Sequence, residues 1–356
     1  MKRGRIILSI ITIVLMAVLV YVARADIMEA MQLATTARIG YLMLLIPLQA
    51  LMYFTAGQVY FSYLSAKKQI SKVNIARRMR LALELNFVKN VIPAGGVAGV
   101  GYMAWRLKSW GLKAGPAALA QLVRYLVVLI ASIILIFLAS IRLIAEGFGW
   151  LPVLLGVGLS VGALTIILVL SWILKNRKRI NWTGRTVSKI VNFIVAVATL
   201  GRRKRMLAST HVDEFLSDLH EDYVELLKNK KALIPPLLWA GFYVLLDTAT
   251  FFVVFLALGV RVDFGAVLIA QILASVVGTL LQTPGGGAGF YEATMTGFFA
   301  LLGVPFATAI AATLMTRVAV MLGTIIFGWA FYQHALTTAG DGKKDGKGVK
   351  APKRAK

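Results

Sequence analysis

Six apolar segments of this chain are long enough to cross a lipid bilayer as helices. About 20 apolar residues in a helix span the roughly 30 Å hydrocarbon core. Apolar residues make up 59% of the 356 residues and charged residues only 15%, against about 45–50% and 25% in soluble proteins. The chain is therefore predicted to be an all-α, polytopic integral membrane helix bundle. The expected full spans are residues 6–23, 39–64, 117–140, 151–174, 232–258 and 304–334.

The first of these segments also resembles a signal peptide. Basic residues precede it, and Ala23-Arg24-Ala25 follows it, as in a cleavage site with small residues. The apolar run is long for a cleaved peptide, and Arg24 is poorly placed at the cleavage point. We therefore expect an uncleaved first span, with cleavage as the alternative.

Basic residues lie mostly in alternate segments between the spans. If the N-terminus is cytoplasmic, the cytoplasmic segments hold 32 of the 39 Lys and Arg residues, and the outer segments hold four. This asymmetry follows the positive-inside rule and predicts a cell (inner or plasma) membrane protein with both termini in the cytoplasm. The net charge of +24 is then explained by orientation and by contact with anionic lipids, and no nucleic-acid partner is expected.

Two further apolar regions, residues 81–105 and 265–302, are interrupted by glycine and proline. The charge pattern is kept only if each region enters and leaves the membrane on the same side. Both are therefore predicted to be glycine/proline-broken re-entrant helical hairpins, or broken helices. The alternative is that one of them crosses the membrane fully.

The two interrupted regions resemble each other. Each has a polar amide two or three residues before a proline, then a glycine cluster, and later a full span with one arginine. Arg124 lies 31 residues after Pro93, and Arg317 lies 33 residues after Pro284. Because the two units have opposite predicted topology, the pattern indicates an inverted repeat, an architecture found in transporters.

The chain is expected to form one transmembrane domain, residues 1–334, with repeat units at about 39–140 and 232–334. Residues 175–231 form a cytoplasmic segment whose second half is amphipathic, and 335–356 form a basic, disordered cytoplasmic tail. The amphipathic stretch is either a solvated helix under the bundle or a docking face. A partner there would be a soluble enzyme or a second copy of the chain, bound through residues 211–227.

Polar residues within the apolar regions predict a lipid-headgroup site between the repeats. The helix after each proline turn would point its N-terminus, with free N–H groups, at the membrane midplane, where an anion such as phosphate is favoured. Buried charges are usually functional or paired, so structural pairs of Glu292 or Asp247 with an arginine are the alternative. The predicted site residues are Asn86, Lys89, Asn90, Pro93, Gly95, Gly96, Arg124, Pro284, Gly285, Gly286, Gly287, Glu292 and Arg317.

Residue types typical of many enzyme sites are missing from the sequence. There is no cysteine, and the histidines are His211, His220 and His334, too scattered for a metal centre. No nucleotide-binding motif is present, which argues against transport driven by ATP. We therefore expect no enzyme activity, no cofactor and no metal.

Residues 284–292 (PGGGAGFYE), followed by Arg317, resemble the second signature of the flippase-like transmembrane region of lysylphosphatidylglycerol synthases. Residues 86–106 resemble the first signature. Many relatives have an acid soon after the first glycine turn, whereas residues 97–100 have none, and Val123 stands where an acid often precedes the arginine. The resemblance implies an inner-membrane helical protein that moves a lipid between leaflets.

In the full synthases, a separate cytoplasmic domain transfers an amino acid to the lipid, and only a short tail follows His334 here. The expected function is translocation of a phospholipid or other lipid phosphate, by alternating exposure of a midplane headgroup site. One alternative is a secondary transporter of a small soluble anion. The other is an accessory membrane subunit that docks a lipid-synthesis enzyme. Membrane lipids, in particular anionic ones, are the expected partners.

Overall fold

The computed structural model describes most of the apolar part of the chain, and every regular element in that part is a helix. The described residues are 14, 17, 21, 24–66, 73–92, 95–110, 115–147, 150–184, 186, 220–221, 223–280 and 289–338. No strand occurs among them. The prediction of an all-α membrane helix bundle is confirmed, while the predicted first span at 6–23 lies almost entirely outside these residues.

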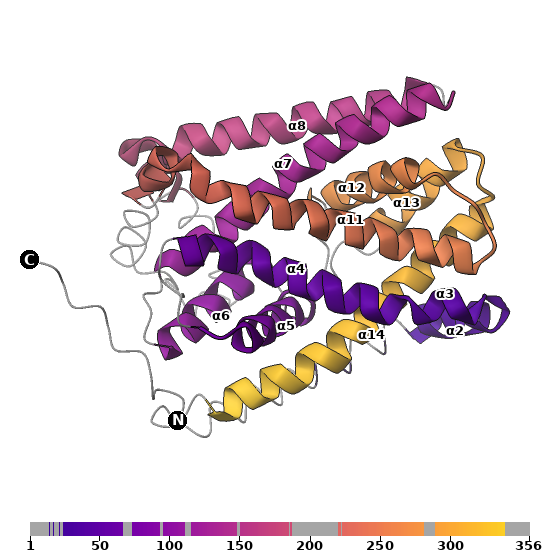
Figure 1. Cartoon of the computed structure of the whole chain (residues 1–356), viewed down its shortest axis with the longest axis horizontal. Coiled ribbons are helices and arrows are strands. Elements are labelled where there is room, and N and C mark those ends of the chain that lie inside the picture. The colour runs from indigo at the N-terminus through magenta and orange to yellow at the C-terminus, as the bar shows by residue number, and fades with distance from the viewer. Residues whose placement is uncertain are drawn as a thin grey trace, which may run out of the picture.

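Among the described residues, five helical segments are long and apolar enough to cross a membrane, and they match the five other predicted spans. The long helices are α3 (Ile39–Met43) with α4 (Leu45–Ala66), α7 (Gly115–Ala145), α8 (Trp150–Leu174), the 3-10 turn η1 (Lys230–Leu233) with α11 (Ile234–Ala257), and α14 (Phe306–Thr338). They run roughly along the long axis of the molecule in Figure 1. The chain is thus a multi-pass membrane protein.

Each region interrupted by glycine and proline forms a pair of shorter helices. They are α5 (Ile75–Val91), α6 (Gly95–Ser109), α12 (Phe264–Leu280) and α13 (Phe290–Leu301). These helices of 17, 15, 17 and 12 residues are about 18–26 Å long at 1.5 Å per residue, shorter than the hydrocarbon core. The members of each pair pack against each other. Their re-entrant insertion and inverted-repeat relation stay predictions.

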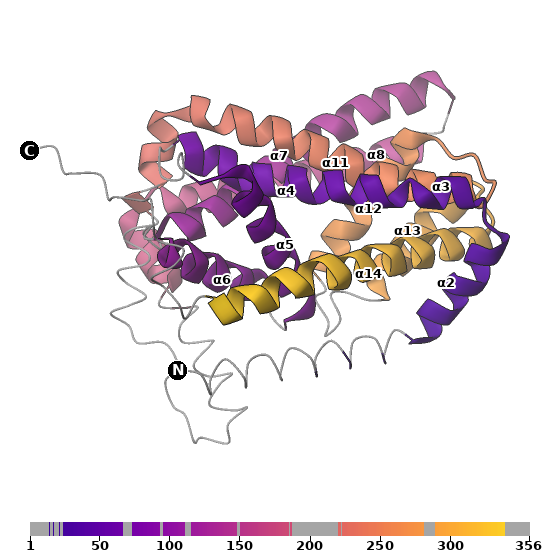
Figure 2. The same ribbon diagram turned by 60° about the horizontal axis from the view of Figure 1, so that its bottom comes forward.

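The two short pairs lie toward opposite ends of the bundle. The pair α5 and α6 lies at one end in Figure 1, and α12 and α13 lie in the other half, an arrangement also visible after the rotation in Figure 2. The helix α2 (Arg24–Thr36) packs against α14, and α8 packs against α7 and α12 at one edge. The long helices α4, α7, α11 and α14 therefore connect the two ends.

Helix ends in this bundle are closed by local hydrogen bonds and glycines. The side chain of Asn74 caps α5 by accepting a hydrogen bond from the Ala76 backbone N–H at 3.3 Å. Gly147, Gly259 and Gly303 follow the last turns of α7, α11 and α13 with φ near +80°. That left-handed conformation ends a helix at little cost only for glycine, so the turns between helices are set by the sequence.

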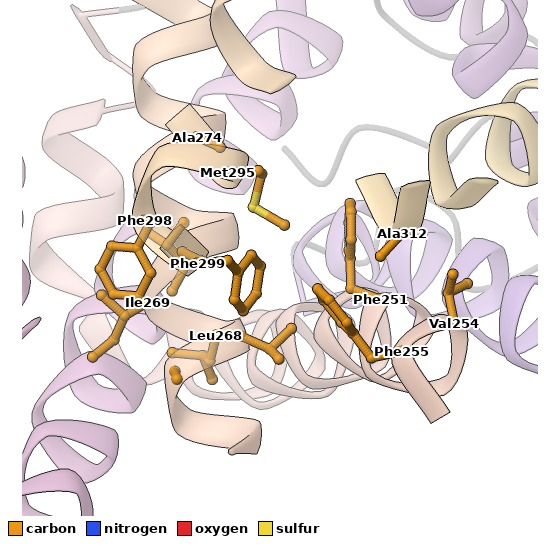
Figure 3. Packing of buried hydrophobic residues seen from close by; sticks show 14 of the residues in the cluster. Phe251, Val254, Phe255, Leu268, Ile269, Ala274, Met295, Phe298, Phe299 and Ala312 are labelled. Atoms are coloured by element: carbon orange, nitrogen blue, oxygen red, sulfur yellow. The ribbon is translucent and has the colours of Figure 1, made fainter. Parts of the chain in front are cut away.

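Each short pair has its own apolar core. Around α12 and α13, aromatic side chains of α11 and α13 interlock, and the rings of Phe255 and Phe299 lie 4.7 Å apart (Figure 3). Around α5 and α6, a second cluster includes Tyr63, Leu85 and Met103. The helices α7 and α11 contribute buried residues to both cores. These two helices therefore run through the region where the cores meet.

Close helix crossings at glycines hold α5 inside the bundle. A methyl group added at Gly328 on α14 would lie 2.6 Å from Cβ of Phe87 and 3.1 Å from the Leu83 carbonyl oxygen, both on α5. At Gly57 on α4 an added methyl would lie 2.8 Å from Cβ of Ala82. Small residues allow such backbone approach between membrane helices.

Replacing Gly328 by alanine is expected to destabilise the protein. The added methyl cannot be accommodated without shifting α5 or α14, which costs about 1–3 kcal/mol as overpacking. The matched control is Gly241→Ala in α11, where an added Cβ meets nothing within 4 Å. Thermal unfolding in detergent should show a lower midpoint for Gly328→Ala and an equal or higher one for the control. Equal midpoints for Gly328→Ala and wild type would contradict the packing argument.

Candidate functional site

Two cationic side chains and three tyrosines lie together between helices of the bundle. We call Tyr60 on α4, Tyr125 on α7 and Tyr243 on α11 the tyrosine cage. The Lys89 Nζ atom, from α5, donates a hydrogen bond to the Tyr60 hydroxyl at 2.5 Å. The Arg124 Cζ atom, from α7, lies 5.2, 5.9 and 5.5 Å from the ring centroids of Tyr60, Tyr125 and Tyr243. Four helices thus supply one polar site.

The two cations of this site lie near the same tyrosine ring, and neither has an acidic group in ion-pair contact among the described residues. Lys89 Nζ and Arg124 Cζ both lie 5.2 Å from the ring centroid of Tyr60. Aromatic faces attract such cations, but only by about 0.5–2 kcal/mol. Like charges this close repel each other in a medium of low polarity. An anion bound between them would remove that repulsion.

The guanidinium of Arg124 also has unused hydrogen-bonding capacity. Its Nε atom is buried and has no hydrogen-bond partner among the residues that the structure describes. A buried donor left unpaired costs about 1–3 kcal/mol. Guanidinium groups bind phosphate and carboxylate oxygens in a planar, two-point geometry. The arrangement can therefore bind an oxyanion such as a phosphate.

Lys89 reaches the tyrosine cage by crossing over Gly99 of α6. A Cβ atom at Gly99 would lie 3.0 Å from Lys89 Cε and 3.1 Å from Lys89 Cγ. The missing side chain at Gly99 leaves room for the aliphatic part of the lysine. Sequence reasoning missed Gly99, although it belongs to the same glycine-rich stretch as Gly95 and Gly96.

A carboxylate lies beside the cage on α11. Asp247 follows Tyr243 by four residues and so lies on the same helix face, within electrostatic range of Arg124. The Gln271 Nε2 atom of α12 donates a hydrogen bond to Asp247 Oδ2. The Thr248 hydroxyl donates to Gln271 Oε1 at 2.7 Å. The sequence singled out Asp247 only as a structural ion-pair candidate, and the structure places it next to the predicted site.

The two predicted asparagines belong to a separate hydrogen-bonded chain. Asn90 Nδ2 donates to Asn86 Oδ1 at 3.1 Å, and Asn86 Nδ2 donates to the Thr324 hydroxyl at 3.0 Å. The Tyr53 hydroxyl lies 3.1 Å from that of Thr324. This chain links α4, α5 and α14. A direct contact of the asparagines with a headgroup stays a prediction.

In the second half of the chain, Glu292 on α13 forms an ion pair with Arg317 on α14. Glu292 Oε2 also accepts a hydrogen bond from the Gly289 backbone N–H at 2.5 Å, which closes the N-terminus of α13. This pairing was one of the alternatives for Glu292. Arg317 and Arg124, which match in the proposed repeat, thus have different surroundings.

Several predicted residues cannot be placed in the site. Gly95 and Gly96 begin α6. Most of the amphipathic stretch 211–227 is outside the described residues, apart from helical residues 220–221 and 223–227, so its docking role stays a prediction. No group of three potential metal ligands was found in the described part of the chain. Five predicted site residues lie outside the described part of the chain: Pro93, Pro284, Gly285, Gly286 and Gly287.

A fully buried ion pair joins α5 to α6, and the sequence did not predict it. Glu84 accepts hydrogen bonds from Arg106 Nε at 2.9 Å and Nη2 at 3.1 Å, and from the Tyr102 hydroxyl at 3.0 Å. Arg80 adds a contact of 3.0 Å and also lies 2.6 Å from Nδ1 of His334 on α14. Arg106 was assigned to a cytoplasmic segment, although its spacing from Glu84 fits a helical hairpin.

Removing the charge of Glu84 is expected to destabilise the protein strongly. Glu84→Gln would leave Arg106 buried without its counter-charge, and breaking one side of a buried ion pair costs about 3–5 kcal/mol. The control is Glu146→Gln, because Glu146 pairs with Arg142 at the surface, where such pairs contribute little. Thermal unfolding in detergent should show a large drop for Glu84→Gln only. A similar small change in both variants would mean that the buried pair does not hold α5 to α6.

Comparison with known proteins assigns the family. The model of the lysylphosphatidylglycerol synthase TM region matches residues 6–328. A UPF0104 membrane protein of Methanothermobacter thermautotrophicus (strain Delta H) is 39% identical over 74 residues, which are 21% of this chain and 22% of that protein. The alignment thus spans about a fifth of that relative's length, and no solved structure matches the chain. Since the family model covers nearly the whole chain, the protein belongs to the family of the lysylphosphatidylglycerol synthase transmembrane region.

Proposed function

We propose that this protein moves a lipid phosphate between the two leaflets of the cell membrane. The observation that carries the proposal is the convergence of Lys89 and Arg124 on Tyr60, with an unpaired buried Arg124 Nε atom. Two cations within an apolar bundle are costly unless an anion compensates them. The headgroup phosphate of a lipid would supply that anion.

The exposure of the tyrosine cage favours a lipid over a soluble anion. Tyr125 is 49% exposed, and it lies in the candidate span Leu119–Ala145. One wall of the cage is therefore on the outside of the bundle, within an apolar stretch. A headgroup could enter past Tyr125 while its acyl chains remain in the bilayer. The family name, which refers to a phospholipid synthase, also supports a lipid substrate.

The proposed transport cycle uses the two short helix pairs. The pair α5 and α6 carries Lys89, and the pair α12 and α13 contacts Asp247 through Gln271. With both termini in the cytoplasm, as the distribution of basic residues predicts, the first pair would insert from the cytoplasmic side and the second from outside. Rocking of one pair against the other would expose the cage to each leaflet in turn.

We assign no aminoacyl transfer to this chain. The matching family model describes the transmembrane region of the synthases, and no aminoacyl-transferase domain is part of that match. The tyrosine cage itself presents cations and phenol groups, which suit binding and orientation of an anion. The proposal is therefore transport without covalent chemistry.

Lys89→Ala and Arg124→Ala are each expected to slow lipid movement by about 10–100-fold. Each removes a charge-assisted hydrogen bond to the phosphate, worth about 1.5–3 kcal/mol. Purified protein would be reconstituted into liposomes that contain acyl-labelled phosphatidylglycerol, and dithionite quenching would report transfer between leaflets. The control is Arg142→Ala, since Arg142 is an exposed cation paired with Glu146 and Asp263 outside the cage.

The same liposomes separate the lipid proposal from the soluble-anion alternative. Uptake of radiolabelled inorganic phosphate is measured in parallel with transfer of phosphatidylglycerol. Lipid transfer that depends on Lys89 and Arg124, without phosphate uptake, supports the proposal. Phosphate uptake without lipid transfer, or lipid transfer that is equal in wild type and both variants, would overturn it.

Gly99→Ala is expected to reduce lipid transfer because the new methyl group would displace the Lys89 stem. The ammonium group would then lose its place beside Tyr60, and we expect at least about a tenfold loss, as for weakening of one charged hydrogen bond. Gly101→Ala is the matched control on the same helix, because a Cβ there meets nothing within 4 Å. If both variants transfer lipid at the same rate, Gly99 does not position Lys89.

A further inference from the structure

The charge next to the tyrosine cage is not purely positive. Lys89 and Arg124 contribute two positive charges, and Asp247 contributes one negative charge within electrostatic range of Arg124. Three other acids of the surrounding helices are already paired, Glu292 with Arg317, Glu84 with Arg106 and Asp263 with Arg142. With both cations protonated and Asp247 ionised, the cage and its immediate surroundings therefore carry one net positive charge.

The position of Asp247 is held firmly by α12. Its Oδ2 atom accepts a hydrogen bond from Gln271, whose own carbonyl oxygen accepts one from Thr248 at 2.7 Å. Gln271 is 4% exposed and Thr248 is fully buried. Because this hydrogen-bonded chain is buried and continuous, it holds the carboxylate in its position beside the cage. Any headgroup in the cage must tolerate its charge.

We propose that Asp247 makes the site selective for lipid phosphodiesters over lipid phosphomonoesters. This inference rests on the proposed lipid transport and adds the class of headgroup. A phosphodiester carries a single negative charge, whereas a phosphomonoester carries about 1.5–2 negative charges near pH 7. The phosphodiester neutralises the net charge of the site, whereas the phosphomonoester brings more negative charge than the site can neutralise.

The low polarity of the surroundings makes this difference large. An uncompensated charge is costly inside an apolar bundle, so a complex with matched charge is favoured over one with an excess negative charge. The excess charge of a phosphomonoester would also lie near Asp247, and like charges repel more strongly where water is excluded. The carboxylate thus acts as a specificity-determining group for the substrate that Lys89 and Arg124 bind.

The test compares two lipids with the same labelled acyl chains. Phosphatidylglycerol is the phosphodiester and phosphatidate is the phosphomonoester, each reconstituted at the same fraction in neutral phosphatidylcholine vesicles at pH 7.5. The wild type should transfer phosphatidylglycerol faster. In Asp247→Asn the ratio of the two rates should shift toward phosphatidate by about tenfold or more, since one repulsive charge is removed. Asparagine can still accept the hydrogen bond from Gln271.

Asp263→Asn is the matched control, because Asp263 is a buried acid that pairs with Arg142 and caps α12 outside the cage. It should leave the ratio of rates as in wild type. An unchanged ratio in Asp247→Asn, with phosphatidylglycerol transfer still dependent on Lys89, would overturn this inference and leave the proposed transport standing. If wild-type protein transfers neither lipid, both proposals fall.

A measurement on the wild-type protein alone guards against misfolding of Asp247→Asn. Short-chain phosphatidylglycerol and short-chain phosphatidate are added separately to the protein in detergent, and the midpoint of thermal unfolding is followed. A ligand that binds the folded state raises the midpoint in proportion to its affinity. The expected result is a larger rise with phosphatidylglycerol. An equal or larger rise with phosphatidate would overturn the selectivity.

Discussion

A backbone in hydrocarbon must satisfy its own hydrogen bonds, and this constraint determines how the chain can be folded. Long helices meet it along their length, but a helix that ends at membrane depth leaves four N–H or C=O groups to be covered by protein. Here the short pairs α5 with α6 and α12 with α13 are packed among longer helices that extend past them. The long helices therefore provide the surroundings in which broken helices are tolerated.

Burying charge is the second constraint, and the described part of the bundle meets it in two different ways. Glu84 and Arg106 neutralise each other through paired hydrogen bonds, and Glu292 pairs with Arg317. Arg124 instead lies among tyrosine rings with Lys89 nearby. Arg124 and Arg317, which match in the sequence, therefore have different neighbours. Eight residues after Pro284 the chain has Glu292, which pairs with Arg317. Eight residues after Pro93 it has Gly101, which has no acidic group.

Much of the helix arrangement could be predicted from the sequence. The length of each apolar segment shows whether it can span the membrane as a helix, and glycine and proline show where a helix is interrupted. The full spans from residue 39 onward and both pairs of short helices follow from that pattern. Lys89 and Arg124 were also recognisable as buried cations. Their tyrosine partners were not, since Tyr60 and Tyr243 look like ordinary aromatic residues in apolar spans. Contacts such as Lys89 with Gly99 depend on how helices cross, which spacing within one helix does not reveal.

The crossing of Lys89 over Gly99 makes anion affinity sensitive to helix register. Residues three or four apart share a helix face and are separated by about one turn, roughly 5.4 Å along the axis, so a slide of α6 by one turn toward its N-terminal end would bring Tyr102 or Met103 under the lysine stem in place of Gly99. Either side chain would lift the ammonium group away from Tyr60. In the proposed transport, an axial movement of one helical turn between the two packed helices would then weaken the binding of the ligand, and release would need no change in the charges themselves.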